Sequence, residues 1–97
     1  MATVVYSKRA LGHIERTFEV SRDKNPDAAR SAVTAIQSAV DNLAAHPLVG
    51  RRLEGELREL IISLGHSGHV ALYRFMIAKD EVRILAIRRQ REIGYLP

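Results

Sequence analysis

Hydrophobic residues recur at helical intervals in two stretches of the first half of the chain. After Ser7, which suits an N-cap, apolar residues three or four positions apart predict an amphipathic helix over residues 8–20. A second helix is predicted over residues 26–44, because Asn25 can cap its start and Pro47 prevents its continuation. The apolar stripes are Leu11, Ile14 and Phe18 in the first helix, and Ala29, Ala32, Val33, Ile36, Ala39, Val40 and Leu43 in the second.

In the second half, from Leu57 onward, hydrophobic residues alternate with polar ones, which is the period of a strand. Turns predicted at residues 65–68 and 79–80 divide this half into strands. The last strand is the most apolar, so we expect it to lie in the interior of the sheet. The strands and their shared faces are residues 57–64 (Leu60, Ile62, Leu64), 69–77 (Ala71, Tyr73, Phe75, Ile77) and 82–88.

Residues 3–6 are β-branched and aromatic and predict a first strand, which gives the order β-α-α-β-β-β. The fold class is therefore predicted to be α+β. A helical hairpin covers one face of a small antiparallel sheet and leaves the other face partly open. Residues 1–97 fit one small domain, and residues 90–97 are too short for more than coil or a single turn.

Composition narrows the class of protein. The 97 residues are 46% hydrophobic and 27% charged, which suits a soluble globular domain, and no apolar run approaches the ~20 residues that span a bilayer. The chain has no cysteine, which excludes disulfides, thiolate metal sites and cysteine catalysis. We expect a cytoplasmic protein that does not bind a membrane.

The balance of charge indicates an acidic partner. The formal net charge is +4 and the sequence pI is about 10.0. Residues 1–50 carry six cationic and five acidic residues, which gives a net charge of +1. Residues 51–97 carry nine cationic and six acidic residues, which gives +3. Twelve of the fifteen cations are arginines, whose planar guanidinium binds carboxylates and phosphates in a bidentate manner.

Two groups of arginines are candidates for binding. The first follows the last strand and combines cations with an acid and an aromatic ring; its alternative interpretation is a solvated strand end. The second group lies within strands, where an arginine is costly unless it faces water or a carboxylate, so it could line a basic groove on the uncovered sheet face. Its alternative is pairing across strands with Glu59, Asp80 or Glu81. The first group is Arg88, Arg89, Arg91, Glu92 and Tyr95, and the second is Arg58, Arg74 and Arg83.

The remaining motifs do not predict chemistry. His66 and His69 flank a turn, where we expect exposed polar surface, and neither a cysteine nor a nearby carboxylate completes a metal ligand set. The serines and histidines do not form a hydrolase triad, and Gly65 and Gly68 lack the lysine and the helix of a phosphate loop. We therefore assign no catalytic residue, metal or cofactor.

Several short motifs follow one another in the second half of the chain. They are residues 57–62 (LRELII), Gly68, residues 72–74 (LYR), residues 84–88 (ILAIR) and Arg91-Glu92. In this order and spacing, the motifs resemble the RelE/ParE toxins of type II toxin–antitoxin systems, and the resemblance covers nearly the whole chain. It implies a small sheet with a helical hairpin, and a cognate antitoxin whose C-terminal segment wraps the toxin.

The two branches of this superfamily imply different activities. RelE-like members are metal-independent, ribosome-dependent ribonucleases, whereas ParE-like members poison DNA gyrase without chemistry of their own. Val70 stands where the ribonucleases often carry an arginine, and their paired lysines would fall on Leu60 and Ile62. The resemblance therefore favours ParE, with a ParD-like antitoxin through which alone operator DNA would be contacted. The tail group would then bind gyrase, and the strand group would bind the antitoxin.

Two alternatives stay open. One is a ribosome-dependent mRNA endonuclease that uses Arg91 and Tyr95. The other is a degenerate, non-toxic co-repressor module.

Overall fold

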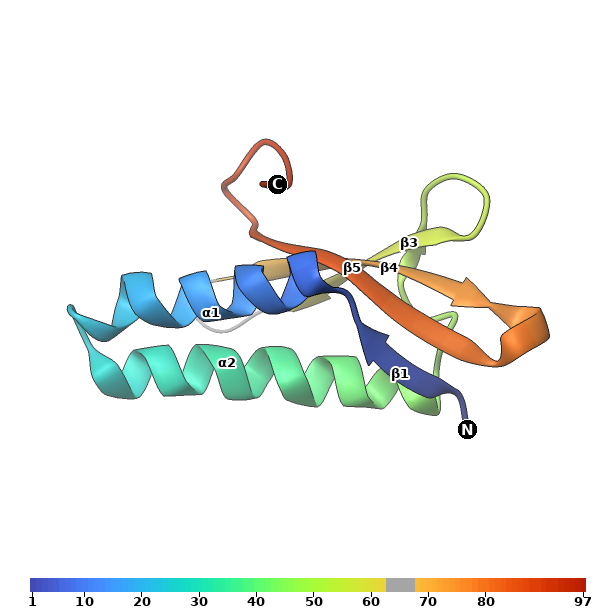
Figure 1. The fold of residues 1–97 in the computed structure, drawn as a ribbon, viewed down its shortest axis with the longest axis horizontal. Helices are drawn as coiled ribbons and strands as arrows, with labels where there is room; N and C mark the ends of the chain where they lie inside the picture. The colour runs from blue at the N-terminus through green and yellow to red at the C-terminus, as the bar shows by residue number, and fades with distance from the viewer. Residues whose placement is uncertain (63–67) are drawn as a thin grey trace.

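The fold is a helical hairpin packed against a five-stranded sheet, as a computed structural model that describes residues 1–62 and 68–97 shows. The helices lie together on one side of the sheet, and the C-terminal segment leaves β5 on the other side (Figure 1). The order of elements is β1 (Thr3–Tyr6), α1 (Lys8–Arg22), α2 (Pro26–Asp41), η1 (Asn42–Ala44), β2 (Arg51–Arg52), β3 (Leu57–Ile62), β4 (His69–Met76), η2 (Ile77–Lys79) and β5 (Glu81–Arg89).

Both helices begin where their capping residues predict. The Ser7 hydroxyl accepts a hydrogen bond from the amide of Ala10, and the Asn25 side chain accepts one from Ala28. The first helix runs two residues further than predicted, and the second continues as a 3-10 turn over residues 42–44. In the described part of the chain, no helix combines the length and the apolar character needed to cross a membrane.

The sheet confirms the α+β class and differs from the prediction in two details. Its strand order is β1-β5-β4-β3-β2, with β5 in the interior as expected. The pairing of β1 with β5 is parallel, so the sheet is mixed rather than wholly antiparallel. The short strand β2 was not predicted, because two arginines carry no apolar alternation.

Two predicted positions on β4 differ in the structure. Ile77 lies beyond the strand, in η2, with 76% of its surface exposed, so it does not share the buried face of Tyr73. His69, expected as exposed turn surface, is buried at the start of β4. Of the turn predicted at residues 65–68 and the strand end at Leu64, only Gly68 lies within the described residues.

The core lies between the helices and one face of the sheet. A bulge in the β4–β5 pairing lets Ile84 and Ile87 both face the helices, although they are three residues apart. By register, Val70 and Ala86 lie on the opposite face, yet both are buried. The second face is therefore not fully open. The core residues are Ala2, Ala10, Ile36, Val40, Leu43, Ile62, Ala71, Tyr73, Val82, Ile84 and Ile87.

Candidate functional site

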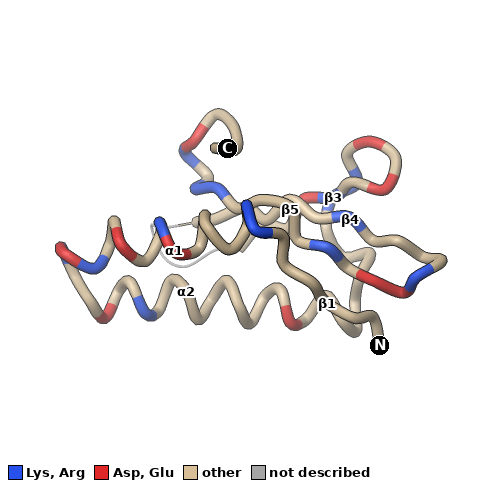
Figure 2. The backbone as a smooth tube through the Cα atoms, viewed as in Figure 1, with Lys and Arg blue, Asp and Glu red and all other residues tan. Residues whose placement is uncertain are grey.

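The end of β5 sends adjacent arginines to opposite faces of the sheet, as strand alternation predicts. Arg88 reaches the face away from the helices, where it lies near Glu59 of β3. Arg89 lies on the helix side and lines a cavity beside α1. Figure 2 shows charges of both signs along the segment that follows β5. The predicted tail group is therefore divided between two surfaces.

Arg88 organises the tail on the open face. Its Nη1 atom donates to the carbonyl oxygens of Arg89, Gln90 and Glu92 at 3.0–3.3 Å. Its guanidinium lies 5.3 Å from the centre of the Tyr95 ring, which is a cation–π contact. Only 19% of the Arg88 side chain is exposed. Arg88 therefore mainly stabilises the tail through contacts within the protein.

Glu59 is the negative centre of this face. Its carboxylate accepts a hydrogen bond of 2.7 Å from the Tyr95 hydroxyl and one of 2.9 Å from Arg51 Nη2, and it lies 3.8 Å from Arg88 Nη2. Glu59 therefore connects the neighbouring strands β2 and β3 to the C-terminal end of the chain, which is distant in sequence. Its side chain is 13% exposed, so these contacts are better shielded from solvent than a surface ion pair.

The electrostatics of the cluster fix both protonation states. Burial alone would raise the pKa of Glu59, but hydrogen bonds from Tyr95 and Arg51 and the charges of Arg88 and Arg51 outweigh it and lower the pKa. Burial, followed by the hydrogen bond to Glu59 and its negative charge, raises the pKa of the Tyr95 hydroxyl far above its usual value. Tyr95 is therefore a neutral hydrogen-bond donor, and Glu59 is a charged acceptor.

The tail is held a second time on the helix side. Arg9 donates to the carbonyl oxygens of Leu96 and Tyr95 at 2.7 and 3.2 Å, and His13 Nε2 lies 2.8 Å from the oxygen of Leu96. Because His13 Nδ1 accepts from the amide of Ile87, the hydrogen of a neutral ring must lie on Nε2, which then donates to Leu96. His13 therefore joins α1, β5 and the tail.

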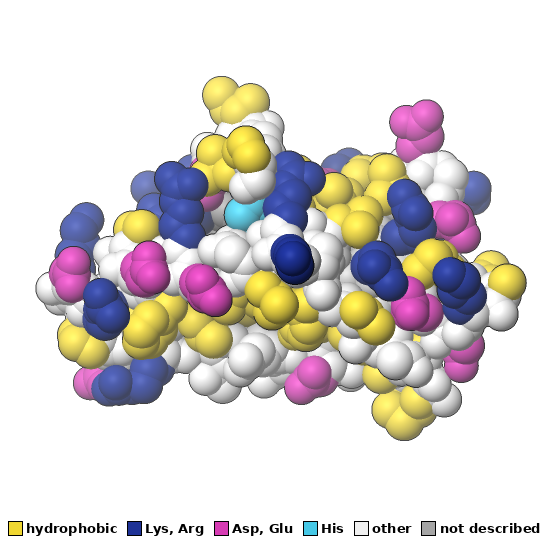
Figure 3. Space-filling view, in the orientation of Figure 1, with side chains coloured by type: hydrophobic (Ala, Val, Ile, Leu, Met, Phe, Trp, Pro, Cys, Tyr) yellow, Lys and Arg dark blue, Asp and Glu magenta, His cyan; other side chains and the backbone are white. Residues whose placement is uncertain are grey.

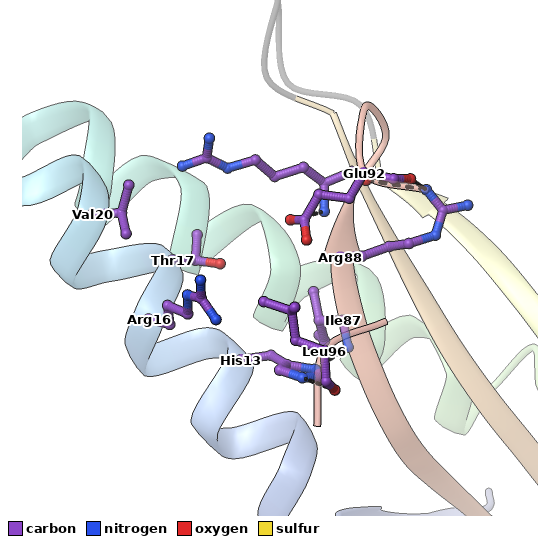
Figure 4. Close-up of a pocket in the computed structure, with 9 residues that line it drawn as sticks. His13, Arg16, Thr17, Val20, Ile87, Arg88, Glu92 and Leu96 are labelled. Atoms are coloured by element: carbon purple, nitrogen blue, oxygen red, sulfur yellow. Dashed lines mark hydrogen bonds between the residues drawn. The ribbon is translucent and has the colours of Figure 1, made fainter. Parts of the chain in front are cut away.

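Between these attachments lies a cavity of about 230 Å³. Arg16 and Thr17 of α1 lie on one side of it, opposite Glu92 and Leu96 of the tail (Figure 4). In the space-filling view, cationic side chains lie on either side of a histidine beneath the tail (Figure 3). The lining residues are His13, Arg16, Thr17, Val20, Ile87, Arg88, Arg89, Glu92 and Leu96.

The structure brings together only part of the predicted tail group. Arg88 and Tyr95 are in contact, and the Glu92 carboxylate accepts from the amide of Arg89. The side chains of Arg89 and Arg91 are exposed. These two arginines are available to a partner, whereas Arg88 and Tyr95 are engaged within the protein.

The three strand arginines do not share one face, contrary to the expected groove. Arg58 is paired in register with the buried Tyr73, and it donates to the carbonyl oxygens of Leu48 and Gly50 at 3.1 and 2.9 Å. Arg74 and Arg83 lie opposite each other on the other face. The expectation fails for Arg58 because β3 places it on the helix side. Arg83 also pairs with Glu81 at 3.2 Å, but both residues lie on β5, so this is not the pairing across strands considered from sequence.

Sequence reasoning missed the residues that hold the site together. Glu59 appeared only as a neighbour for strand arginines, and His13 and Arg16 did not appear. His13 lies three positions after the apolar Ala10, and this helical spacing is the signal that could have placed it on the buried face of α1. Its partners lie more than seventy residues away, and helical periodicity does not reveal them. Within residues 1–62 and 68–97, no three potential metal ligands gather.

Comparison with known proteins gives consistent results. Residues 4–94 match the family model for the ParE toxin of the type II toxin–antitoxin system parDE. Two curated toxins of Caulobacter vibrioides are similar over most of their length. RelE3 is 34% identical, covering 95% of this chain and 98% of the relative. RelE2 is 31% identical, covering 91% and 94%.

Solved structures share the fold. A chromosomal ParDE system from P. aeruginosa aligns with a TM-score of 0.72 at 24% identity, covering 92% of this chain and 96% of the other. The intact RelBE toxin–antitoxin complex of E. coli aligns with a TM-score of 0.65 at 13% identity, covering 95% and 100%. On the family match and the two curated relatives, this chain belongs to the ParE toxins of type II toxin–antitoxin systems, within the RelE/ParE superfamily.

Proposed function

We propose that this toxin arrests growth by poisoning DNA gyrase and that it performs no RNA chemistry. It would stabilise gyrase's cleaved DNA complexes and so block replication. The observation that carries this proposal is the Glu59 carboxylate beside Arg88 and Tyr95. The carboxylate engages the Tyr95 hydroxyl, which the alternative ribonuclease would need for its substrate, and lies beside the charge of Arg88.

Cleavage of a phosphodiester by its 2′-hydroxyl needs a base and cations that stabilise the developing charge. Tyr95 is poorly suited as the base, since its hydroxyl donates to Glu59 and its pKa is raised. Leu60 and Ile62 supply no cation on β3, and Val70 is buried on β4. These features favour a toxin that binds its target over one that cuts RNA.

The gyrase-binding surface is proposed to be the tail group, led by its exposed cations. Arg89 and Arg91 would contact the target, while Arg88, Glu92 and Tyr95 would hold the tail in its binding shape. Arginine forms strong bidentate contacts with carboxylates and phosphates, and gyrase bound to DNA offers both.

A cognate antitoxin is the second proposed partner. Two of the structural neighbours are a ParDE system and a RelBE toxin–antitoxin complex, which supports such a partner for this chain. Arg74 and Arg83 lie opposite each other on the open face and would meet acidic side chains of the antitoxin. Arg58 would contribute only at the edge, near Gly50.

The test is a DNA cleavage assay with purified gyrase, supercoiled plasmid and this toxin. Linear DNA should accumulate, an equimolar cognate antitoxin should suppress it, and Arg91→Ala should reduce it. Arg30→Ala is the matched control, because Arg30 is an exposed arginine on α2, outside the tail. If DNA cleavage stays at the background level although the toxin is folded, the proposal is wrong.

The ribonuclease is the second candidate, because the curated relatives carry RelE names. Mapping mRNA ends shortly after expression separates the two. Cuts within translated codons would support the ribonuclease, whereas intact mRNA with DNA-damage signalling would support gyrase. Normal growth with soluble toxin and no antitoxin would instead support the co-repressor.

A further inference from the structure

The cavity between α1 and the tail is lined by cations from two different elements. Arg16 comes from α1, and Arg89 comes from the end of β5. Both side chains are exposed, and neither takes part in an ion pair among the described residues. The third arginine, Arg88, lies near Glu59 on the other face. Arg16 and Arg89 are therefore the cations available to a ligand.

The cavity also has an apolar wall. Val20, Ile87 and Leu96 line it, and Val20 remains 47% exposed. A volume of about 230 Å³ exceeds what one small inorganic anion fills, so it leaves room for an aliphatic side chain beside a charged group. The hydroxyl of Thr17 adds a hydrogen-bonding group at the α1 side (Figure 4).

One lining residue disfavours nucleic acid. Glu92 contributes a carboxylate to the same wall as Leu96, where it would repel a nucleic-acid backbone, which carries a negative charge at every successive phosphate. A single carboxylate can bind near Arg16 and Arg89 while its neighbouring aliphatic group contacts Val20 and Leu96. The combination fits a protein segment better than a phosphate backbone.

We propose that this cleft binds a short acidic–aliphatic segment of a protein partner, with a glutamate or aspartate at Arg16 and Arg89 and a leucine-sized side chain against Val20, Ile87 and Leu96. The cleft shares Arg89 with the surface proposed for gyrase, but binding of the segment does not require that the toxin acts on gyrase rather than on mRNA. Because Leu96 is also held by Arg9 and His13, a bound segment would rest against a tail that is already fixed.

The test is an NMR titration of the ¹⁵N-labelled toxin with three probes. The first is an acetylated, amidated pentapeptide with a leucine–glutamate–leucine centre, the second is its glutamine analogue, and the third is inorganic phosphate. We expect saturable shifts at the amides of Thr17, Val20 and Glu92 with the glutamate peptide. The glutamine peptide should bind about tenfold more weakly, which corresponds to one charge-assisted contact.

Variants locate the contact. Arg16→Ala and Arg89→Ala should each lower the affinity for the glutamate peptide about five- to tenfold. Arg16→Lys should restore part of the loss because it retains the charge, and Arg30→Ala on α2 should change nothing. Equal binding of the glutamate and glutamine peptides, or no saturable shift at about 10 mM peptide, would overturn the proposal. Phosphate that binds at least as tightly at the same amides would assign the cleft to nucleic acid instead.

Discussion

The Tyr95 hydroxyl donates a hydrogen bond of 2.7 Å to the Glu59 carboxylate, which ties the C-terminal tail to a strand that lies 36 residues earlier. With Arg88 beside both groups, this contact sets the charge of the open sheet face. The same contact holds the tail together with the hydrogen bonds from Arg88, Arg9 and His13.

Glu59→Gln should loosen the tail and lower stability. The neutral amide keeps the shape of the side chain but loses the charge that attracts Arg88 and Arg51. We expect the free energy of unfolding to fall by about 1–3 kcal/mol, as measured by urea denaturation. Glu56→Gln, in the exposed loop before β3, is the control and should change it by less than about 0.5 kcal/mol. Equal stabilities of the two variants would show that the cluster contributes nothing.

The same carboxylate predicts a dependence of stability on acid. The pKa of Glu59 is lower in the folded protein than its ordinary value of 4.5, so below that value the unfolded chain binds the proton more readily. The contribution of Glu59 is complete above about pH 4.5 and is lost as the pH falls through the folded pKa. Urea denaturation between about pH 3 and 6 should show a smaller decline for Glu59→Gln than for the wild type. An unchanged decline would contradict the lowered pKa.

His13→Ala should be among the more damaging changes on α1. It leaves the amide of Ile87 without its acceptor at the buried edge of β5 and frees the carbonyl oxygen of Leu96. A buried donor left unsatisfied, together with the lost packing, should cost about 2–4 kcal/mol of unfolding free energy. Hydrogen exchange at Ile87 should accelerate as well. His46→Ala, at an exposed position, is the control. If His13→Ala lowers the unfolding free energy no more than His46→Ala does, His13 does not stabilise the contact between α1, β5 and the tail.

Tyr73→Phe tests the attachment of the loop before β2. The Tyr73 hydroxyl accepts from the amide of Gly50 at 2.9 Å and donates to the carbonyl of Pro47 at 2.8 Å. Loss of the hydroxyl should lower the unfolding free energy by about 1–3 kcal/mol. The reason is that the Gly50 amide and the Pro47 carbonyl would both lose their hydrogen-bond partner beside a fully buried side chain. The matched control is Tyr6→Phe, at a half-buried position on β1. The melting temperatures of the two variants, measured by calorimetry, should differ by several degrees. Equal melting temperatures would argue that the Tyr73 hydroxyl does not stabilise the loop.

Substitutions of Arg88 and Arg91 should distinguish a residue that stabilises the tail from one that contacts the target. Arg91 is exposed, so Arg91→Ala should reduce gyrase-dependent DNA cleavage at least about tenfold with little change in stability. Arg88→Ala should reduce cleavage and also destabilise the tail, which loses three carbonyl contacts. Cleavage assays paired with urea denaturation make the comparison. Full activity of Arg91→Ala would mean that this residue lies outside the binding surface.

The sequence by itself determined the helices, most of the strands and the family. Ser7 and Asn25 cap their helices through contacts with residues three positions away, and such local contacts can be read from local sequence. Alternation likewise placed Arg88 and Arg89 on opposite faces. Two features escaped this reasoning. The parallel pairing of β1 with β5 joins the two ends of the chain, and β2 consists of two arginines without an apolar pattern.

Only the tertiary structure decided the site. Glu59, Arg88 and Tyr95 come from a strand, another strand and the tail, and their contact depends on the sheet register and on the turn after β5. Arg58 shows the same dependence, since its place opposite Tyr73 puts it on the helix side. The charge of a single residue can be read from sequence. Which charges neutralise one another depends on distances that the fold alone sets.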